Sequence, residues 1–472
     1  MSVIAIDQGT TSTRSLKLNE DGQYSITHSI AHEQHYPQPG WVEHDPEELI
    51  RNIQACINAS GKVDAIGIDN QGESCLAWDA ETKEALTSVI VWQDKRTSNV
   101  IEKLKQEDHE ETTLAKAGLP LDPYFSASKL GWIIKNSPEA KEAQSRGKLR
   151  LGTTDAFFLD RLTGKCVTDI TTASRTSLMN LRTHQWDEEL CALFGVPMNS
   201  LPDIVPTTGN FGTIQTDNGP VPVTASIVDQ QAALYGFGCR KEGDGKITFG
   251  TGAFALMVTG SELHHRPDLG LLPTVAWQKH GEVPVYALDG GVYTASAALN
   301  WAKGLGLFEK FEDINQFTSH AAIDQGLVFV PALSGLGCPH WDDKARGSWM
   351  GLSLDHEPQQ LIQAILEGIA FRAAEIWNAM QQCVASTGPV PVDGGMSQNA
   401  YFVQFLSDCL GRTVQPANIP ELTAIGTALL AAEGVSHPIA FMPGFGKHVP
   451  MVDRSAGYQK FQKAVGMSRN WS

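Results

Sequence analysis

One pattern occurs in both halves of the chain: an apolar segment, a turn of glycine and threonine, and a second apolar segment. The first copy covers residues 3–18 with its turn at residues 9–11, and the second covers residues 246–258 with its turn at residues 250–252. Two apolar segments joined by such a turn predict a β-hairpin. The repeat predicts two halves with related folds, and the alternative is that two such turns occur by chance in a chain of this length.

The length of the chain and a glycine-rich stretch predict where the two halves meet. At about 150 residues per domain, 472 residues correspond to two or three domains. Residues 236–245 are charged and contain glycine at positions 236, 238, 243 and 245, which is typical of a flexible connection. We therefore predict an N-terminal domain at residues 1–238 and a C-terminal domain at residues 239–472.

Charge and composition exclude several classes of protein. The formal net charge of −17 repels phosphate backbones and anionic lipids, so we expect no nucleic-acid partner and no membrane partner. The eight cysteines form no C-x-x-C pair, which argues against a zinc ribbon or a disulfide scaffold. Asp7 interrupts the apolar N-terminal segment, and no apolar run approaches the ~20 residues that span a bilayer, so we expect a cytoplasmic protein.

Strand and helix signals alternate along the chain, which favours an α/β sheet in each half. Strands are expected near residues 24–30, 63–68, 89–92 and 390–392. A helix is expected to begin at Asp45, followed by Pro46 and by Glu48 as the second member of a capping box. Further helices are expected at residues 359–382, with one apolar face, at 399–410, and at 423–433 with Gly434 just beyond the end.

Two motifs at predicted strand ends suit a phosphate group. In residues 7–12 (DQGTTS) and 248–252 (TFGTG), glycine lets the backbone approach an anion, and amides and hydroxyls can donate to its oxygens. Asp7 ends its strand and is placed to hold Mg²⁺ directly or through water. A purely structural turn is the alternative for each motif.

Two more motifs suit a nucleoside and an acceptor hydroxyl. In residues 392–399 (VDGGMSQN), a strand runs through a double glycine into a helix, which allows close approach of an adenosine; a plain turn is the alternative. In residues 227–234 (IVDQQAAL), Asp229 opens a helix after an apolar strand. It could accept a hydroxyl proton as a general base, and the alternative is a simple helix N-cap.

The four motifs resemble, in order and spacing, those of the FGGY carbohydrate kinases. Further similar segments lie at residues 40–46, 90–93, 96–97, 118–126, 168–169, 173–176, 330–332 and 335–337. The resemblance covers nearly the whole chain. Within the family, the motifs are most similar to those of members that phosphorylate glycerol.

The resemblance implies an α/β fold of two actin-like (ribonuclease H-like) domains flanking a catalytic cleft. The acceptor and the first phosphate loop are then assigned mainly to the first domain and ATP to the second. The implied activity is transfer of the γ-phosphoryl group of ATP to a primary hydroxyl of glycerol, giving glycerol 3-phosphate, or of a closely related small polyol. ATP and Mg²⁺ are the implied cofactors, and a homodimer or a homotetramer is compatible with the resemblance.

The resemblance also implies roles for individual residues. Asp229 is the implied catalytic base and Asp7 the implied metal ligand. The implied polyol-binding residues are Gly72, Glu73, Trp92, Tyr124, Asp229, Gln230 and Phe254. The implied nucleotide-binding residues are Thr10, Thr11, Ser12, Arg14, Thr251, Ser296, Asn300, Gly395 and Asn399.

Some positions depart from the family pattern. Gly72 stands where members that use glycerol carry an arginine before the pocket glutamate, and losing such a contact costs on the order of 1.5–3 kcal/mol. A pocket enlarged at Gly72 would favour a four- or five-carbon polyol or a ketose as the alternative acceptor. Ser296 and Asn300 replace the usual glycine and glutamine. A non-catalytic, ATP-binding actin-like switch is a remote alternative, against which Asp229 and Glu73 argue.

Overall fold

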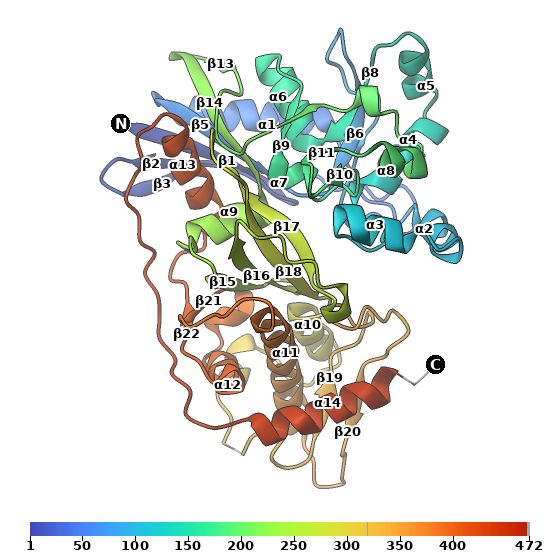
Figure 1. The fold of residues 1–472 in the computed structure, drawn as a ribbon. Coiled ribbons are helices and arrows are strands. Elements are labelled where there is room, and N and C mark those ends of the chain that lie inside the picture. The colour runs from blue at the N-terminus through green and yellow to red at the C-terminus, as the bar shows by residue number, and fades with distance from the viewer. Residues whose placement is uncertain (319, 470–472) are drawn as a thin grey trace. The chain divides into compact units, whose positions relative to one another are not determined.

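The computed structural model describes residues 1–318 and 320–469, which form two compact units (Figure 1). The first unit contains Met1–Gly238, Thr274–Tyr286 and Glu421–Met442. The second contains Cys239–Pro273, Ala287–Pro420 and the described chain from Pro443 onward. Two segments that follow residue 238 in the sequence are therefore part of the first unit. The predicted domain boundary between residues 238 and 239 assigns both of them to the C-terminal domain.

The first unit is built on a six-stranded sheet. Its strand order is β13 (Thr213–Thr216), β14 (Gly219–Val228), β5 (Ala65–Asn70), β1 (Ser2–Gln8), β2 (Ser12–Asn19) and β3 (Tyr24–Ala31). Strands β1, β2 and β3 are antiparallel, whereas β5 runs parallel to β1 and β14 runs parallel to β5. The carboxyl ends of β1, β5 and β14 consequently meet at one edge of the sheet.

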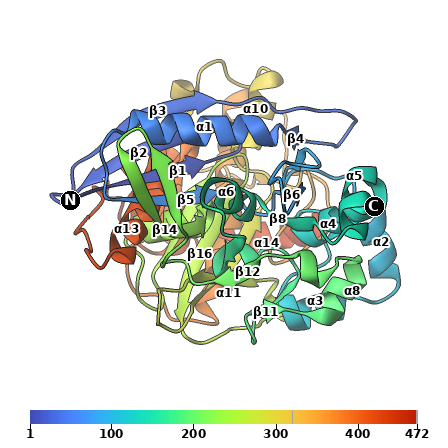
Figure 2. The ribbon, with the colours of Figure 1, turned by 90° about the horizontal axis from the view of Figure 1, so that it is seen from above.

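Helices cover both faces of this sheet. Helix α1 (Pro46–Ala59) packs on β1, β2 and β3, and Figure 2 shows it running along them. Helix α13 (Leu422–Gly434) packs on β1, β5 and β14. Successive side chains of a strand point to opposite faces of the sheet, so each face of β5 meets a different helix. Ile66 and Ile68 join the apolar cluster that includes α1, whereas a Cβ atom at Gly67 would meet Thr427 of α13.

Helix α9 (Asp229–Gly236) crosses α13 at a contact between two glycines. A Cβ atom at Gly236 would overlap the carbonyl oxygen of Leu422, and a Cβ atom at Gly426 would overlap that of Ala232. Only glycine lets the two helix backbones approach this closely. The crossing fixes α9, and with it Asp229, against the sheet.

A smaller sheet in the first unit has the order β4 (Glu43–His44), β7 (Val89–Ile90), β6 (Cys75–Asp79) and β8 (Leu149–Thr153). In this sheet, β6 follows the segment that contains Gly72 and Glu73, and β7 directly precedes the segment that contains Trp92. The remaining elements of the first unit are α2 (Ser98–Gln106), α3 (Glu110–Ala117), α4 (Ser126–Asn136), α5 (Pro138–Ser145), α6 (Thr154–Thr163), β9 (Val167–Asp169), α7 (Ile170–Ala173), β10 (Met179–Asn180), β11 (Gln185–Trp186), α8 (Glu188–Phe194), η1 (Met198–Ser200) and β12 (Asp203–Val205).

The second unit is built on a sheet of similar order. The order is β17 (Leu272–Trp277), β18 (Val285–Val292), β16 (Ala253–Gly260), β15 (Gly245–Phe249), β21 (Val390–Gly394) and β22 (Val414–Pro416). Residues 274–277 of β17 and 285–286 of β18 belong to the segment that is grouped with the first unit. Strands β15 and β16 form an antiparallel hairpin, β21 is parallel to β15, and β22 is parallel to β21. The hairpin β15–β16 thus corresponds to β1–β2, and β21 to β5. The prediction of two halves with related folds is confirmed.

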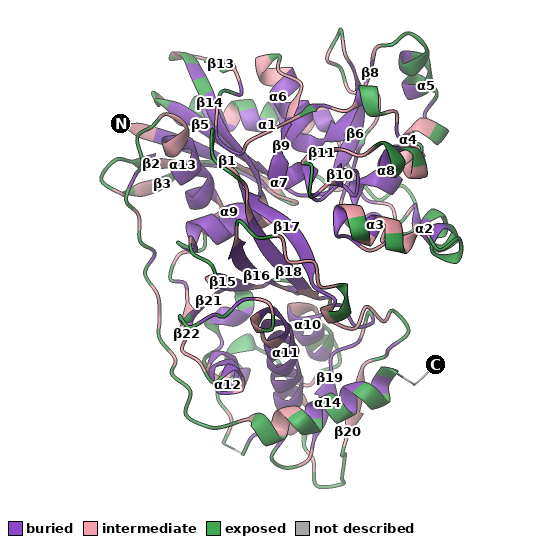
Figure 3. Cartoon of the chain, viewed as in Figure 1, coloured by how far each residue is buried: buried purple, intermediate pink, exposed green. Residues whose placement is uncertain are grey.

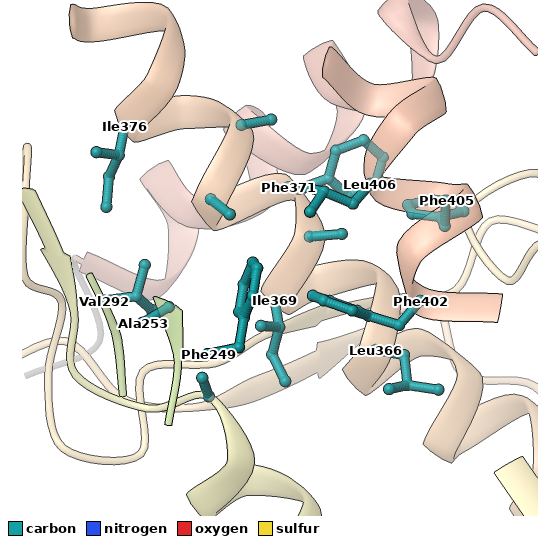
Figure 4. Packing of buried hydrophobic residues seen from close by; sticks show 14 of the residues in the cluster. Phe249, Ala253, Val292, Leu366, Ile369, Phe371, Ile376, Phe402, Phe405 and Leu406 are labelled. Atoms are coloured by element: carbon teal, nitrogen blue, oxygen red, sulfur yellow. The ribbon is translucent and has the colours of Figure 1, made fainter. Parts of the chain in front are cut away.

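The core of the second unit surrounds α11 (Pro358–Gln381). The predicted apolar face is buried, and burial extends to every residue of α11 from 362 to 377, so the other faces of this stretch are buried as well; Figure 3 shows the helix buried along this stretch. In Figure 4, Phe249 lies beside Ile369, with Phe402 next to them, and Phe371 lies beside Leu406. The other elements are η2 (Pro267–Leu269), α10 (Ser296–Gly304), η3 (Phe311–Ile314), β19 (Val328–Val330), β20 (Ser348–Met350), η4 (Gly395–Gln398), α12 (Ala400–Leu410) and α14 (Ser455–Arg469).

Four further features bear on the predictions. Asp45 caps α1 by accepting from the N–H of Glu47 rather than through the predicted reciprocal pair with Glu48. Gly434 is the last residue of α13 and not the residue beyond it, and a Cβ atom there would overlap the carbonyl of Thr224. All eight cysteines lie in the described chain and are free thiols. Among the described helices, none has the length and apolar character needed to cross a membrane.

Candidate active site

Three aspartates meet at the carboxyl edge of the first sheet. Asp7 of β1 is aligned with Asp69 of β5, and Asp229 follows β14 directly. Burial raises the pKa of Asp7, and the positive charge of Arg14 opposes this rise. Burial also raises the pKa of Asp69 well above its ordinary value, with further contributions from the negative charges of Asp7 and Asp229. The mutual influence of these carboxyls shows that they share one polar site.

Asp69 was not among the predicted site residues. A signal for it exists in the sequence, since residues 66–70 (IGIDN) repeat the pattern of residues 4–8 (IAIDQ), with the acid in the same place. The hydroxyl of Thr427 in α13 donates to Asp69 Oδ2 over 2.7 Å. Helix α13, which is distant in sequence, therefore supports the acidic edge.

Asp229 is the first residue of α9, and Val228 is its N-cap. The backbone N–H of Gln230 donates to Asp229 Oδ1 over 2.6 Å, and the backbone N–H of Val228 donates to Thr171 Oγ1 over 3.0 Å. The alternative of Asp229 as a simple N-cap is therefore not what the structure shows. Its carboxyl group lies in the first turn of α9, at the positive end of the helix.

The turn after β1 is closed by a hydrogen bond from the N–H of Gly9 to the carbonyl of Ser12, 3.0 Å long. Thr11 and Arg14 are exposed, and Thr10 and Ser12 are half-buried. His32 forms two hydrogen bonds with the turn. Its Nε2 donates to the Thr10 carbonyl over 2.9 Å, and its backbone N–H donates to the Thr11 carbonyl over 3.1 Å. Of the predicted phosphate-binding residues of the first unit, Thr10 and Thr11 therefore lie on one braced turn, and Ser12 and Arg14 lie at the start of β2.

Glu73 adopts a left-handed backbone conformation, with φ of +59°. For a residue with a side chain this costs about 1–3 kcal/mol and is common at functional sites. The Nε of Arg175 lies 2.8 Å from Glu73 Oε1, and the hydroxyl of Ser126 donates to the Glu73 carbonyl over 3.0 Å. Arg175 was not predicted to belong to the site, because its motif carries no sign of this distant partner.

Two of the three predicted aromatic residues of the acceptor pocket are in contact. The rings of Trp92 and Tyr124 are 5.6 Å apart and inclined at 68°. The backbone N–H of Trp92 donates to Ser74 Oγ over 3.1 Å, and Lys129 Nζ donates to the Tyr124 carbonyl over 2.6 Å. Ser74 adjoins Glu73, and Ser126, two residues after Tyr124, donates to the Glu73 carbonyl, so the chain segments that carry Glu73, Trp92 and Tyr124 lie together.

Gly72 was predicted to leave an open volume for a larger acceptor. The structure shows how much space there is for the first side-chain atom, Cβ, at this position. Among the described residues, a Cβ atom at position 72 would meet Val228 Cγ2 at 2.8 Å, which is closer than carbon atoms pack. Val228 is itself buried. The contact with Val228 restricts the first atom of a side chain at position 72, and the larger pocket proposed beyond it stays a prediction.

In the second unit, the turn after β15 is joined to the start of α10. The carbonyl of Thr251 accepts from the N–H groups of Ala295 and Ala297 over 2.9 and 3.2 Å, and the carbonyl of Gly250 accepts from that of Ser296 over 3.1 Å. Thr251 and Asn300 are exposed, and Ser296 is half-buried. Since Ser296 and Asn300 are four residues apart on a helix, they lie on one face of α10.

The double glycine that follows β21 lies beside the same turn. Gly394 has φ of +87°, and a Cβ atom there would overlap the carbonyl of Phe249. Around Gly395, in contrast, no described atom lies within 4 Å of where a Cβ would be. Asn399 caps α12 by accepting from the Phe402 N–H over 2.8 Å, and its amide donates to the Ile314 carbonyl over 2.8 Å. Its predicted place beside adenosine stays a prediction.

The predicted residues are divided between the two units. The first unit contains Asp7, Thr10, Thr11, Ser12, Arg14, Gly72, Glu73, Trp92, Tyr124, Asp229 and Gln230. The second contains Thr251, Phe254, Ser296, Asn300, Gly395 and Asn399. Phe254 was predicted for the acceptor pocket, and in the second unit its ring lies beside Gly291.

Two units with the same strand order, each with a Gly-Thr turn after its first strand, define the two-domain actin-like class of α/β proteins. Comparison with family models places the chain within that class. Residues 2–236 match the N-terminal domain, and residues 245–434 the C-terminal domain, of the FGGY family of carbohydrate kinases. The chain belongs to this family, and it is an ATP-dependent carbohydrate or polyol kinase.

Individual relatives are similar over nearly their whole length. The chain is 40% identical to a glycerol kinase of Bdellovibrio bacteriovorus, over 92% of this chain and 90% of the relative. It is 39% identical to a glycerol kinase of Coxiella burnetii, over 98% and 97%. Among solved structures, Plasmodium falciparum glycerol kinase with ADP has a TM-score of 0.90 at 31% identity, covering 99% of this chain and 98% of that one. A gluconate kinase of Lactobacillus acidophilus has a TM-score of 0.87 at 22% identity, covering 99% and 96%, and shares the fold.

Proposed function

We propose that this kinase transfers the γ-phosphoryl group of ATP to a primary hydroxyl of glycerol and so forms glycerol 3-phosphate. The observation that carries the proposal is the cluster of Glu73, Trp92 and Tyr124 in a chain 40% identical to a glycerol kinase. A buried carboxylate can bind neighbouring hydroxyls, and aromatic faces can cover a short carbon chain. In this proposal Gln230 and Phe254 also line the acceptor pocket.

Asp229 is the proposed general base. Its carboxylate accepts the proton of the attacking hydroxyl as the new oxygen–phosphorus bond forms and the bond to the leaving ADP oxygen breaks. The amides and hydroxyls of Thr10, Thr11 and Ser12, with the cationic Arg14, hold the phosphates. Since phosphoryl transfer needs little covalent help, positioning and charge stabilisation supply most of the rate enhancement.

The remaining nucleotide contacts are proposed for the second unit. Thr251 is exposed on its turn and would donate to a phosphate, and Ser296 and Asn300 share one face of α10. The open space at Gly395 would admit the adenosine, with Asn399 shaping the loop through its cap. The ADP in the structure of the Plasmodium falciparum relative is consistent with a nucleotide site in this fold.

The first unit has oxygen donors that fit Mg²⁺. Asp69 is buried and Asp7 is aligned with it on the neighbouring strand, so the two carboxyl groups lie at the same edge of the sheet. The described residues contain no cluster of three acidic, histidine or cysteine ligands, but Mg²⁺ in kinases commonly uses one or two carboxylates plus phosphate oxygens and water. Asp7 and Asp69 would hold the ion, which when bound neutralises charge on the phosphates.

The alternative of a four- or five-carbon acceptor assumes free space beyond Gly72. Val228 limits that space only next to the backbone, so this alternative stays a prediction. The cytoplasmic location and the homodimer or homotetramer stay predictions.

A panel of acceptors tests the proposed substrate. The purified chain would be assayed for ADP release with Mg-ATP and glycerol, erythritol, xylitol, ribulose or xylulose, with ³¹P NMR to identify the product. We expect the highest kcat/KM with glycerol and a product identical to glycerol 3-phosphate. A longer acceptor that is favoured by about tenfold, equivalent to about 1.4 kcal/mol, would contradict the proposal.

A further inference from the structure

One hydrogen bond joins a predicted acceptor residue to a predicted phosphate-binding residue. The indole Nε1 of Trp92, which follows β7, lies 3.1 Å from Oγ1 of Thr10, in the turn after β1. Both side chains are half-buried, and both residues belong to the first unit. The proposed function gives each residue a separate task and does not explain why the two side chains are joined.

The chemistry of this pair fixes the direction of the bond. An indole nitrogen can only donate, so the Thr10 hydroxyl must be the acceptor. A hydroxyl has a single proton, and this proton is therefore directed away from Trp92. The bond makes the Thr10 hydroxyl a donor toward any other acceptor, which is what an anionic phosphate oxygen requires.

The backbone around Thr10 is already held by other contacts. His32 Nε2 donates to the Thr10 carbonyl over 2.9 Å, and the His32 N–H donates to the Thr11 carbonyl over 3.1 Å. The ring of His32 packs edge-on against that of His44, with ring centres 4.8 Å apart. Because these contacts fix the backbone of Thr10, the hydrogen bond from Trp92 mainly restricts the rotation of the Thr10 hydroxyl.

The position of Trp92 depends in turn on the acceptor cluster. Its ring packs edge-on against Tyr124, and its backbone N–H donates to Ser74 Oγ, next to Glu73. An acceptor that packs against this cluster would restrict the indole. The restriction reaches Thr10 directly, because only one hydrogen bond separates the two side chains.

We infer that Trp92 is a positioning residue through which acceptor binding and nucleotide binding strengthen each other. The inference rests on the proposed function, since it takes Trp92 to contact the polyol and Thr10 to contact phosphate. By thermodynamic linkage, the factor by which the acceptor tightens the nucleotide equals the factor by which the nucleotide tightens the acceptor. For a single hydrogen bond of this kind we expect a factor of about two to ten.

Calorimetry measures this coupling factor directly. The dissociation constant of Mg²⁺-adenylyl imidodiphosphate would be measured with and without saturating glycerol, and the ratio of the two constants is the coupling factor. In Trp92→Phe, which keeps an aromatic ring but loses the indole N–H, we expect the ratio to fall to about one and kcat to fall more than the KM for glycerol changes.

Changes at Thr10 test the other end of the bond. Thr10→Val should abolish the coupling, whereas Thr10→Ser, which keeps the hydroxyl, should restore most of it. The double variant Trp92→Phe/Thr10→Val should show no further loss of coupling beyond either single change, because both remove the same bond. Thr10→Val and Thr10→Ser leave Trp92 in place, so they test the inference even where Trp92→Phe folds poorly.

A matched control is available in the same unit. Trp186 donates its indole N–H to the Pro202 carbonyl over 2.7 Å, so Trp186→Phe also loses an indole hydrogen bond, in a segment outside the proposed site. We expect Trp186→Phe to keep the wild-type coupling factor.

The outcomes separate this inference from the proposed function. Wild-type coupling in Trp92→Phe or Thr10→Val, or losses that simply add in the double variant, would overturn the inference while glycerol turnover by the wild type still supports the function. Wild-type protein that does not phosphorylate glycerol would overturn the function. The same ratios, measured with the acceptor that the wild type does use, would then decide the inference.

Discussion

At the scale of the residue, Glu73 obtains its cationic partner from a distant segment. The residue before Glu73 is glycine, and Arg175 instead approaches the carboxylate at 2.8 Å, with both side chains buried. A buried charge needs such a partner, and removing one member of a buried pair typically costs about 3–5 kcal/mol. The pair holds the carboxylate where the acceptor is proposed to bind, despite the left-handed backbone.

Replacing Gly72 tests how tightly this region is packed. A side chain at position 72 would press on Val228, which precedes Asp229. We therefore expect Gly72→Arg to lower the free energy of unfolding by about 1–3 kcal/mol and to reduce glycerol turnover. Urea unfolding and steady-state kinetics measure both effects.

The companion variant Gly72→Arg/Val228→Ala provides the control, since it removes the methyl groups that a Cβ atom would meet. We expect it to recover part of the activity lost in Gly72→Arg. A Gly72→Arg protein that is as stable as the wild type and uses glycerol better would show that the space beside Gly72 is open after all.

At the scale of the element, the crossing of α9 and α13 sets the position of the proposed base. Asp229 opens α9, and the two helices meet through Gly236 and Gly426 with no side chain between them. Helix α13 also supports Asp69 through Thr427. Two of the acidic residues thus depend on one helix that lies almost two hundred positions after α9 in the sequence.

We expect Gly426→Ala to disturb this crossing, because its methyl group would overlap the Ala232 carbonyl. Overpacking of this kind costs about 1–3 kcal/mol or more, so the unfolding midpoint in urea and kcat should both fall. Gly304→Ala in α10, where no described atom lies within 4 Å of the new carbon, is the matched control and should be neutral or slightly stabilising. Equal stability of the two variants would contradict the close approach of the helices.

Local patterns explain which elements could be predicted. The hairpins were predictable because alternating apolar residues and a Gly-Thr turn lie within a few neighbouring positions. The return of α13 to the first unit was not, because it depends on glycines that meet only in the folded chain. The contact of Gly434 was not predictable for the same reason: this last residue of α13 is a glycine that admits the backbone of Thr224, rather than the residue beyond the helix end.

The same distinction holds for the site. Asp7 and Asp229 were predictable because each follows an apolar strand, where polar residues of α/β sheets meet. Arg175 and His32 were not, since their importance comes from partners elsewhere in the chain, namely Glu73 and the Thr10 carbonyl. Val228 could not be foreseen beside Gly72, because that contact requires β14 to lie next to β5.

At the scale of the whole molecule, one architectural unit occurs twice with different tasks. Each sheet has an antiparallel hairpin with a Gly-Thr turn followed by parallel strands. The first unit adds the smaller sheet that carries the segments with Glu73 and Trp92, and the second adds the helical core around α11. The account assigns the acceptor and the base to the first unit and most nucleotide contacts to the second.

The role of Asp229 as the base is the claim on which this assignment depends, and Asp229→Asn tests it most directly because the amide keeps the shape but accepts no proton. Initial rates of glycerol 3-phosphate formation would be measured beside the affinity for Mg²⁺-adenylyl imidodiphosphate. We expect kcat to fall by about 10²- to 10⁴-fold while nucleotide affinity changes little. An Asp229→Asn enzyme that phosphorylates glycerol at the wild-type rate would contradict the account.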